Sequence, residues 1–192
     1  MACVGDKVEQ FLEAVDDPDH IKMVREVCEL FRTEIVPRLH LLPRQVIHGD
    51  ANYTNILITA GTVHDLGFID FGDVNFSCRV FEVAISLMYI LNVPHELSCG
   101  RSRMAGHFFA GYHSVNPLSH EEIELLPVLI AARFCQSLVF GAFTSKHLDP
   151  GNEYVVETSK NGWKNFQTFW KLPKEEVLKL WLQMSDKMEE HN

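Results

Sequence analysis

Apolar residues in the first forty positions recur every three or four residues, which is the period of a helix with one buried face. We expect a short helix over residues 6–15 and a longer one that has Asp19 as its candidate N-cap and bends at Pro37. The positions with this spacing in the longer helix are Ile21, Val24, Cys28, Phe31, Ile35 and Leu39. This part of the chain is predicted to pack against a core, and we assign no chemistry to it.

The pattern changes between residues 45 and 70, where short apolar runs alternate with Gly, Asn and Asp. The runs occupy residues 46–47, 56–58 and 66–69. Short runs with these boundaries are typical of strands. Residues 60–62 are the predicted turn of a hairpin.

The helical period returns after a loop that follows residues 73–75 and leads to residue 79. Further helices are predicted over residues 79–92, 102–114, 119–147, 153–170 and 174–190. Ser119 and Glu122 have the spacing of a capping box at the start of the longest helix, and Pro127 is expected to kink or split it. Pro173 suits the first position of the last helix. The patterns together predict an α+β, mostly helical fold, with one domain over residues 1–192 and a small β-hairpin region.

The amino-acid composition of the chain disfavours some classes of binding partner. The chain has 192 residues, with 17 Lys and Arg against 26 Asp and Glu, for a formal net charge of −9. This balance disfavours binding to a phosphate backbone. Its five cysteines include no C-x-x-C pair, which favours free thiols in a reducing compartment, and no apolar run approaches the roughly 18 residues of a membrane span. We therefore expect a cytoplasmic protein with no nucleic-acid or membrane partner.

Polar residues with distinct chemistry lie at the ends of the predicted strands. Asp50 follows the first apolar run, Asn55 opens the second, and Asp70 follows the third. Two carboxylates about 4 Å apart repel by roughly 4 kcal/mol at an effective dielectric of about 20, so a fold that keeps them close favours a cation or a proton between them. Mg²⁺ prefers oxygen ligands and commonly takes one or two carboxylates together with phosphate oxygens. A metal-bound phosphate site is the interpretation that these residues favour.

The spacing of these residues narrows the chemistry. His48, Asp50 and Asn55, followed by the D-F-G of residues 70–72, have the layout of the kinase catalytic loop and its metal motif. Gly49 stands where those kinases have Arg. The chain thereby resembles the aminoglycoside phosphotransferase and choline kinase superfamily, with its H-G-D-x-x-x-x-N loop and I-D-[FW] motif. Over residues 47–90, 132–139 and 160–164 it looks like the hydroxylysine kinase family, of which it matches only the C-terminal half.

The resemblance implies the C-terminal lobe of a protein-kinase-like fold and a role for each motif residue. Asp50 would be the catalytic residue that orients the substrate hydroxyl and is the candidate base. Asn55 and Asp70 would bind the Mg²⁺ that bridges the nucleotide phosphates. His48 would brace the loop by hydrogen bonds, and Gly49 would allow its tight turn. Glu82 would support the loop by accepting hydrogen bonds from its backbone amides.

For two further residues, Asp73 and Arg133, two interpretations remain open. Asp73 would face a substrate amine or would be an ordinary surface residue of its loop. Arg133, on an otherwise apolar helix, would pair with a substrate carboxylate or with Glu82.

The implied reaction is transfer of the γ-phosphate of GTP or ATP to the hydroxyl of 5-hydroxy-L-lysine. An aminoglycoside, choline or homoserine remains an alternative acceptor. Before His48 there is neither a G-x-G-x-x-G loop nor a strand that carries a Lys, so the N-terminal nucleotide lobe is expected to be absent. A catalytically inactive lobe that acts as a binding or scaffold module is therefore an alternative function. A metal-dependent phosphohydrolase is a weaker one, because the extra ligands of a two-metal site are not apparent.

Overall fold

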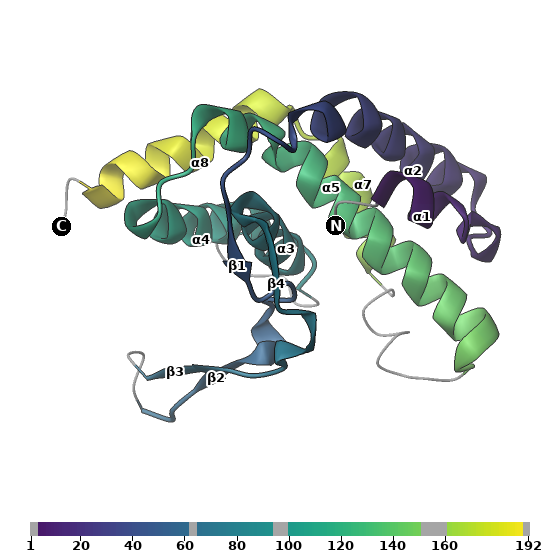
Figure 1. The fold of residues 1–192 in the computed structure, drawn as a ribbon, viewed down its shortest axis with the longest axis horizontal. Coiled ribbons are helices and arrows are strands. Elements are labelled where there is room, and N and C mark those ends of the chain that lie inside the picture. The colour runs from purple at the N-terminus through teal and green to yellow at the C-terminus, as the bar shows by residue number, and fades with distance from the viewer. Residues whose placement is uncertain (1–3, 62–64, 94–99, 151–160, 190–192) are drawn as a thin grey trace.

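The computed structural model describes residues 4–61, 65–93, 100–150 and 161–189, and helices dominate it (Figure 1). In chain order the described helices are α1 (Val4–Glu9), α2 (Pro18–Leu30), α3 (Arg79–Leu91), α4 (Arg101–Val115), α5 (His120–Phe143), α7 (Gly162–Trp170) and α8 (Lys174–Glu189). The described strands are β1 (Arg44–Ile47), β2 (Ile56–Ile58), β3 (Leu66–Phe68) and β4 (Asn75–Cys78). The predicted α+β, mostly helical fold is confirmed.

Helix α5 runs through the centre of the molecule, with α1 and α2 packed on one side and α3 on the other (Figure 1). The predicted capping box is present, because Ser119 Oγ accepts from the Glu122 amide at 3.3 Å and Glu122 Oε2 accepts from the Ser119 amide at 2.8 Å. Pro127 does not split the helix, which is buried on most sides along its length. Packing of this kind outweighs the one backbone hydrogen bond that a proline removes.

The same helix, taken with the turn that extends it to residue 148, is long and apolar enough to cross a membrane by length and composition alone. However, 67% of its most apolar window is buried inside the protein. Its residues contact α1, α2, α3, α7 and α8. The apolar composition of α5 therefore serves the protein core.

The start of α2 differs from the prediction. Asp17, and not Asp19, is the N-cap, because its carboxylate accepts hydrogen bonds from the amides of Asp19 at 2.8 Å and His20 at 3.4 Å. Pro18 occupies the first helical position, where its fixed φ and missing N–H cost little. Helix α2 ends at Leu30. The chain continues through a π-helical turn over Phe31–Ile35 and a 3₁₀ turn over Val36–Arg38, and the 3₁₀ turn contains Pro37.

The strands form two separate antiparallel pairs. β1 pairs with β4, with Ile47 opposite Asn75, and β2 pairs with β3, with Ile56 opposite Phe68. β4 lies where a loop was predicted, because its short, mixed sequence becomes a strand only through pairing with β1. Of the predicted hairpin turn at residues 60–62, the last residue lies outside the described part of the chain.

The predicted helices after β4 are largely confirmed. α3 and α4 agree with their predicted bounds to within one residue. α8 begins at Lys174, one residue after Pro173. α7 begins at Gly162, and the earlier part of that predicted helix, residues 153–160, lies outside the described residues. Cys28, Cys78 and Cys135 are buried, and burial raises the pKa of the Cys135 thiol well above its ordinary value.

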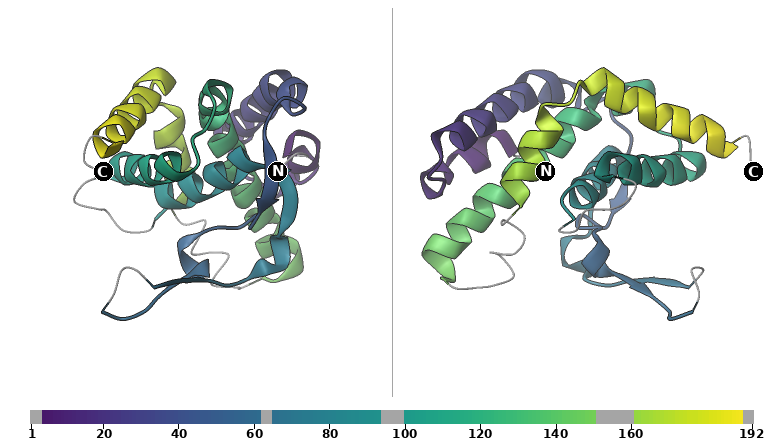
Figure 2. Two further views of the ribbon diagram at one scale, coloured as in Figure 1. Left: turned by 60° about the vertical axis from the view of Figure 1, so that its left-hand side comes forward. Right: turned by 180° about the vertical axis from the view of Figure 1, so that it is seen from behind.

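The β2–β3 hairpin extends away from the helices in all three views (Figures 1 and 2). Large apolar side chains of this region and of the adjacent β1–β4 pair are exposed. These residues, here called the apolar hub surface, are Val46, Tyr53, Leu57, Ile58, Leu66, Phe68, Ile69, Phe71, Val74 and Phe76. Exposed apolar side chains gathered in one part of a protein mark an interaction site more often than scattered single residues do.

Candidate active site

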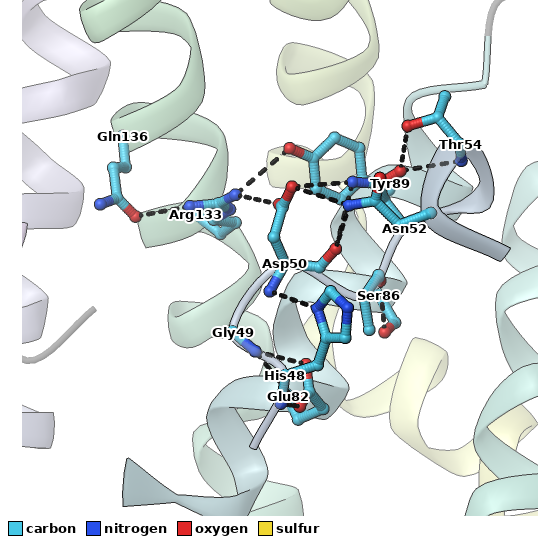
Figure 3. A network of polar contacts seen from close by, with 12 residues as sticks. His48, Gly49, Asp50, Asn52, Thr54, Glu82, Ser86, Tyr89, Arg133 and Gln136 are labelled. Atoms are coloured by element: carbon cyan, nitrogen blue, oxygen red, sulfur yellow. Dashed lines mark hydrogen bonds and ion pairs between the residues drawn. The ribbon is translucent and has the colours of Figure 1, made fainter. Parts of the chain in front are cut away.

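The turn after β1 is held by a carboxylate of α3. Glu82, in the first turn of α3, accepts hydrogen bonds from the backbone amides of His48 and Gly49, the latter at 3.2 Å (Figure 3). This is the contact that the family resemblance implies for Glu82. An ionised carboxylate that accepts from backbone N–H groups makes a stronger hydrogen bond than a neutral acceptor does. Glu82 therefore fixes the backbone from which the following residue, Asp50, projects.

Gly49 meets two constraints that no other residue meets without strain. Its φ is +84°, in the left-handed region that favours glycine. A Cβ atom at this position would also overlap the carbonyl oxygen of Asp73. The turn at Gly49 therefore packs directly against the backbone of Asp73, three residues after Asp70.

His48 joins this turn to the end of β3. Its Nε2 lies 2.9 Å from the carbonyl oxygen of Ile69, and its Nδ1 lies 3.3 Å from the amide nitrogen of Asp50. Both contacts are satisfied by the neutral imidazole that carries its proton on Nε2 and accepts at Nδ1. In this arrangement His48 connects the loop to the residue just before Asp70.

The Asp50 carboxylate is held from two sides (Figure 3). Arg133, from the middle of α5, donates from Nη2 to Oδ1 at 2.8 Å. The side-chain amides of Asn52 and Asn55 donate to Oδ2 at 2.9 and 3.3 Å. The predicted alternative that Arg133 pairs with Glu82 is wrong, because Glu82 is turned to the loop amides while Arg133 faces Asp50.

Tyr89 and Gln136 complete the surroundings of Arg133. The Tyr89 hydroxyl oxygen lies 3.2 Å from Arg133 Nη2, and the guanidinium carbon lies 5.6 Å from the centre of the Tyr89 ring. Gln136 Oε1 accepts from Nη1 at 3.1 Å. Burial raises the pKa of Tyr89 to about 12, although the charge of Arg133 opposes the rise. The Tyr89 hydroxyl is therefore neutral at physiological pH.

Asn55 and Asp70 present oxygen atoms with the chemistry of a hard-cation site. The buried Asn55 directs its Nδ2 to the Asp50 carbonyl oxygen at 3.0 Å, and its backbone carbonyl accepts from Ile69 N at 3.1 Å. Within the described residues, its Oδ1 and the exposed Asp70 carboxylate have no hydrogen bond or ion pair. Carboxylate and amide oxygens suit Mg²⁺, so the residues present fit the ion that the resemblance implies.

The backbone of Asp70 supports the same interpretation. Its φ of 63° is the only positive φ of a non-glycine residue in the described part of the chain. Strained backbone of this kind is concentrated at functional sites. The described residues contain no group of three or more His, Cys, Asp or Glu side chains placed to hold a metal. A metal here would therefore depend on Asn55, Asp70 and the oxygens of its phosphate ligand.

The remaining predicted residue, Asp73, lies apart from Asp50. Its side chain is exposed, while its carbonyl oxygen accepts from Asn75 Nδ2 at 2.7 Å and lies against Gly49. Hydrogen bonds thus join most of the predicted site residues, and Asp70 is placed by Ile69, whose backbone bonds to His48 and Asn55; the residues joined directly are His48, Gly49, Asp50, Asn55, Glu82 and Arg133.

Sequence reasoning missed Asn52, Ser86 and Tyr89. Ser86 Oγ donates to the Ala51 carbonyl at 2.8 Å, which adds a second attachment of the loop to α3. Ser86 and Tyr89 lie four and seven residues after Glu82, so helical spacing alone places them on one face of α3. That spacing was the available signal for both residues.

Comparisons with known proteins identify the family and the relatives of this chain. The model of the phosphotransferase enzyme family matches residues 6–119. Hydroxylysine kinase of Xenopus laevis is 32% identical over 186 residues, which are 92% of this chain and 48% of that protein. The Bos taurus enzyme is 32% identical over 192 residues, which are 95% of this chain and 49% of that protein. The chain thus spans about half the length of these relatives, and the similarity to hydroxylysine kinases is confirmed.

A solved structure is similar in fold. Amicoumacin kinase hAmiN, in complex with AMP-PNP, Ca²⁺ and Ami, aligns with a TM-score of 0.57 over 90% of this chain and 52% of that chain. The sequence identity is 14%, so this match bears on the fold alone. It supports the assignment of a kinase-like lobe.

Proposed function

The chain belongs to the phosphotransferase enzyme family, and on this basis we propose that its Asp50 site transfers the γ-phosphate of a nucleotide to the hydroxyl of a small molecule. One observation carries the proposal. The Asp50 carboxylate is fixed by Arg133, Asn52 and Asn55, while Asn55 Oδ1 and the carboxylate of Asp70, which follows the loop-bonded Ile69, have no partner among the described residues. An oriented acceptor for a hydroxyl and two metal-ligating oxygens are what phosphoryl transfer requires of this half of a kinase.

In this mechanism the protein acts by positioning and by charge. Asp50 accepts a hydrogen bond from the substrate hydroxyl and turns its oxygen toward the γ-phosphorus. Asn55 Oδ1 and Asp70 would hold Mg²⁺, which neutralises phosphate charge when it is bound. Glu82, His48 and Gly49 keep the loop in place. Orientation and preorganised electrostatics of this kind supply most of the catalysis of phosphoryl transfer.

The acceptor that we propose is 5-hydroxy-L-lysine or a related small hydroxylated amine, and the donor is GTP or ATP. Support comes from the relatives, which are named hydroxylysine kinases, and from the net charge of −9, which suits a cationic acceptor. We also propose a cytoplasmic setting, which the buried free thiols of Cys78 and Cys135 support.

A second candidate function is a binding module without turnover. The apolar hub surface favours it, because exposed apolar residues of this extent suit contact with another protein surface. The two candidates differ in one respect, since only the first requires metal-dependent nucleotide binding at Asp70.

An acceptor screen tests the proposal. The chain, alone and together with a matching N-terminal lobe, is incubated with Mg²⁺, GTP or ATP, and 5-hydroxy-L-lysine, choline, homoserine or an aminoglycoside. Mass spectrometry should detect a phosphorylated acceptor, and Asp50→Asn should abolish it. A folded protein that forms no such product in any combination contradicts the proposal and leaves the binding module. Phosphate release without any acceptor would instead favour a phosphohydrolase.

A further inference from the structure

Arg133 is one of two arginines whose ion pairs lie largely inside the described structure. Its side chain is 16% exposed and pairs with Asp50, whose side chain is 21% exposed. The other is Arg79, also 16% exposed, which pairs with the fully buried Glu122 at 2.7 Å. The Arg79 pair ties α3 to the start of α5. The Arg133 pair instead includes Asp50, the residue that we place in the reaction.

The Arg133 guanidinium is fixed by two helices. Tyr89, on α3, contacts Nη2 through its hydroxyl and the guanidinium carbon through its ring. Gln136, one turn after Arg133 on α5, accepts from Nη1. The Nε atom is buried without a hydrogen-bond partner among the described residues. The donor that points into the site, Nη2, is already used by Asp50 and Tyr89.

The contacts on Asp50 use most of its acceptor sites. An ionised carboxylate accepts about four hydrogen bonds. Arg133 takes one site on Oδ1, and Asn52 and Asn55 approach Oδ2. These three donors, together with the Tyr89 hydroxyl, which also makes a hydrogen bond with Asp50, fix the rotation of the carboxylate group that the substrate hydroxyl would approach. Without Arg133, Oδ1 would lose its ion pair, and the carboxylate would be held less firmly in that rotation.

We propose that Arg133 and Tyr89 are positioning residues for Asp50, and that Arg133 does not bind the carboxylate of the acceptor. This inference rests on the proposed phosphotransferase function. The guanidinium fixes the Asp50 carboxylate, and the neutral Tyr89 fixes the guanidinium. Arg133 thereby acts on the reaction through Asp50 and contacts neither the nucleotide nor the acceptor.

Steady-state kinetics of Arg133→Gln, Arg133→Lys and Tyr89→Phe test the proposal, in the form of the protein that is active in the acceptor screen. Misplacement of a reacting group by about 1 Å costs about 10²-fold, so Arg133→Gln should lower kcat by about that factor. The KM for acceptor and for nucleotide should stay unchanged, because no ground-state contact with either is lost. Arg133→Lys should recover part of kcat, and Tyr89→Phe should lower it less than Arg133→Gln does. Arg79→Lys is the matched control and should leave kcat unchanged.

Two kinetic results overturn the proposal. A raised acceptor KM with normal kcat in Arg133→Gln would show that Arg133 binds the acceptor. An unchanged kcat in both Arg133→Lys and Tyr89→Phe would show that neither residue positions Asp50, even if Arg133→Gln failed to fold.

A measurement without turnover separates this inference from the proposed function. The side-chain amide signals of Asn52 and Asn55 in a ¹⁵N–¹H spectrum report the position of the Asp50 carboxylate, to which both amides donate. Arg133→Lys and Tyr89→Phe should shift these signals, and Arg79→Lys should not. If the native chain formed no product but the signals shifted, the proposed function alone would fail. If the native chain were active but the signals and kcat stayed unchanged, the positioning role alone would fail.

Discussion

Removal of the Glu82 carboxylate should destabilise the protein by an amount that follows from its contacts. In Glu82→Ala the amides of His48 and Gly49 lose their acceptor. An unsatisfied amide costs about 1–3 kcal/mol when it is buried, and this region is only partly buried, so we expect a total loss of about 2–4 kcal/mol. Native domains are stable by only about 5–15 kcal/mol, so this is a large fraction of the free energy of unfolding.

Urea unfolding followed by circular dichroism measures this loss, and thermal unfolding gives a second estimate. For a chain of this length a loss of about 2–4 kcal/mol corresponds to a fall in Tm of about 4–16 °C. Glu82→Gln keeps one acceptor oxygen and should lose less than Glu82→Ala. Glu26→Ala, at an exposed position in the middle of α2, is the matched control and should change stability by less than about 0.5 kcal/mol. A Glu82→Ala protein as stable as that control would refute the role of Glu82 as the support of the loop.

Three further predictions concern stability. Arg79→Ala leaves the buried Glu122 carboxylate without its ion pair and should cost about 3–5 kcal/mol in urea unfolding, whereas a loss below about 1 kcal/mol would show that water replaces the guanidinium. Gly49→Ala introduces a Cβ at a φ of +84° against the Asp73 carbonyl and should cost more than about 1 kcal/mol, so a neutral result would contradict the close approach of the two segments. Because the folded-state pKa of Tyr89 is raised to about 12, its contribution to stability is complete below pH 10 and is lost as the pH rises through about 12. Tyr89→Phe should flatten that alkaline fall, and an identical pH profile in the variant would exclude this explanation.

The sequence predicted the local features of the fold well. Helix periods, the capping box at Ser119 and the turn signals depend on residues a few positions apart, so the pattern contains the information that forms them. The cap at Asp17 was missed because Asp19 has the same chemistry, and only the position of Pro18 in the helix decides between them. Strand β4 was missed because pairing with β1, about thirty residues earlier in the chain, creates it.

The residues of the candidate site likewise fall into those that a local motif predicts and those that only the packing of the fold brings together. The spacing of His48, Asp50 and Asn55 is a local signal, and the motif identified these residues. The pairing of Asp50 with Arg133 joins residues 83 positions apart and depends on the packing of α5 against α3, which no local pattern contains. Arg133 was therefore recognised as unusual in an apolar helix, although its partner could not be predicted.

The proposed phosphoryl transfer depends most on the claim that Asn55 and Asp70 hold a metal ion that binds nucleotide phosphates. Isothermal titration of GTP and of ATP, with Mg²⁺ and with the metal chelated, tests it most directly, on the native protein and on Asp70→Ala in the presence of a matching N-terminal lobe. We predict that Mg²⁺ increases nucleotide affinity in the native protein and has no such effect in Asp70→Ala. Equal affinity with and without Mg²⁺ in the native protein, or an unchanged Mg²⁺ effect in the variant, would contradict the claim.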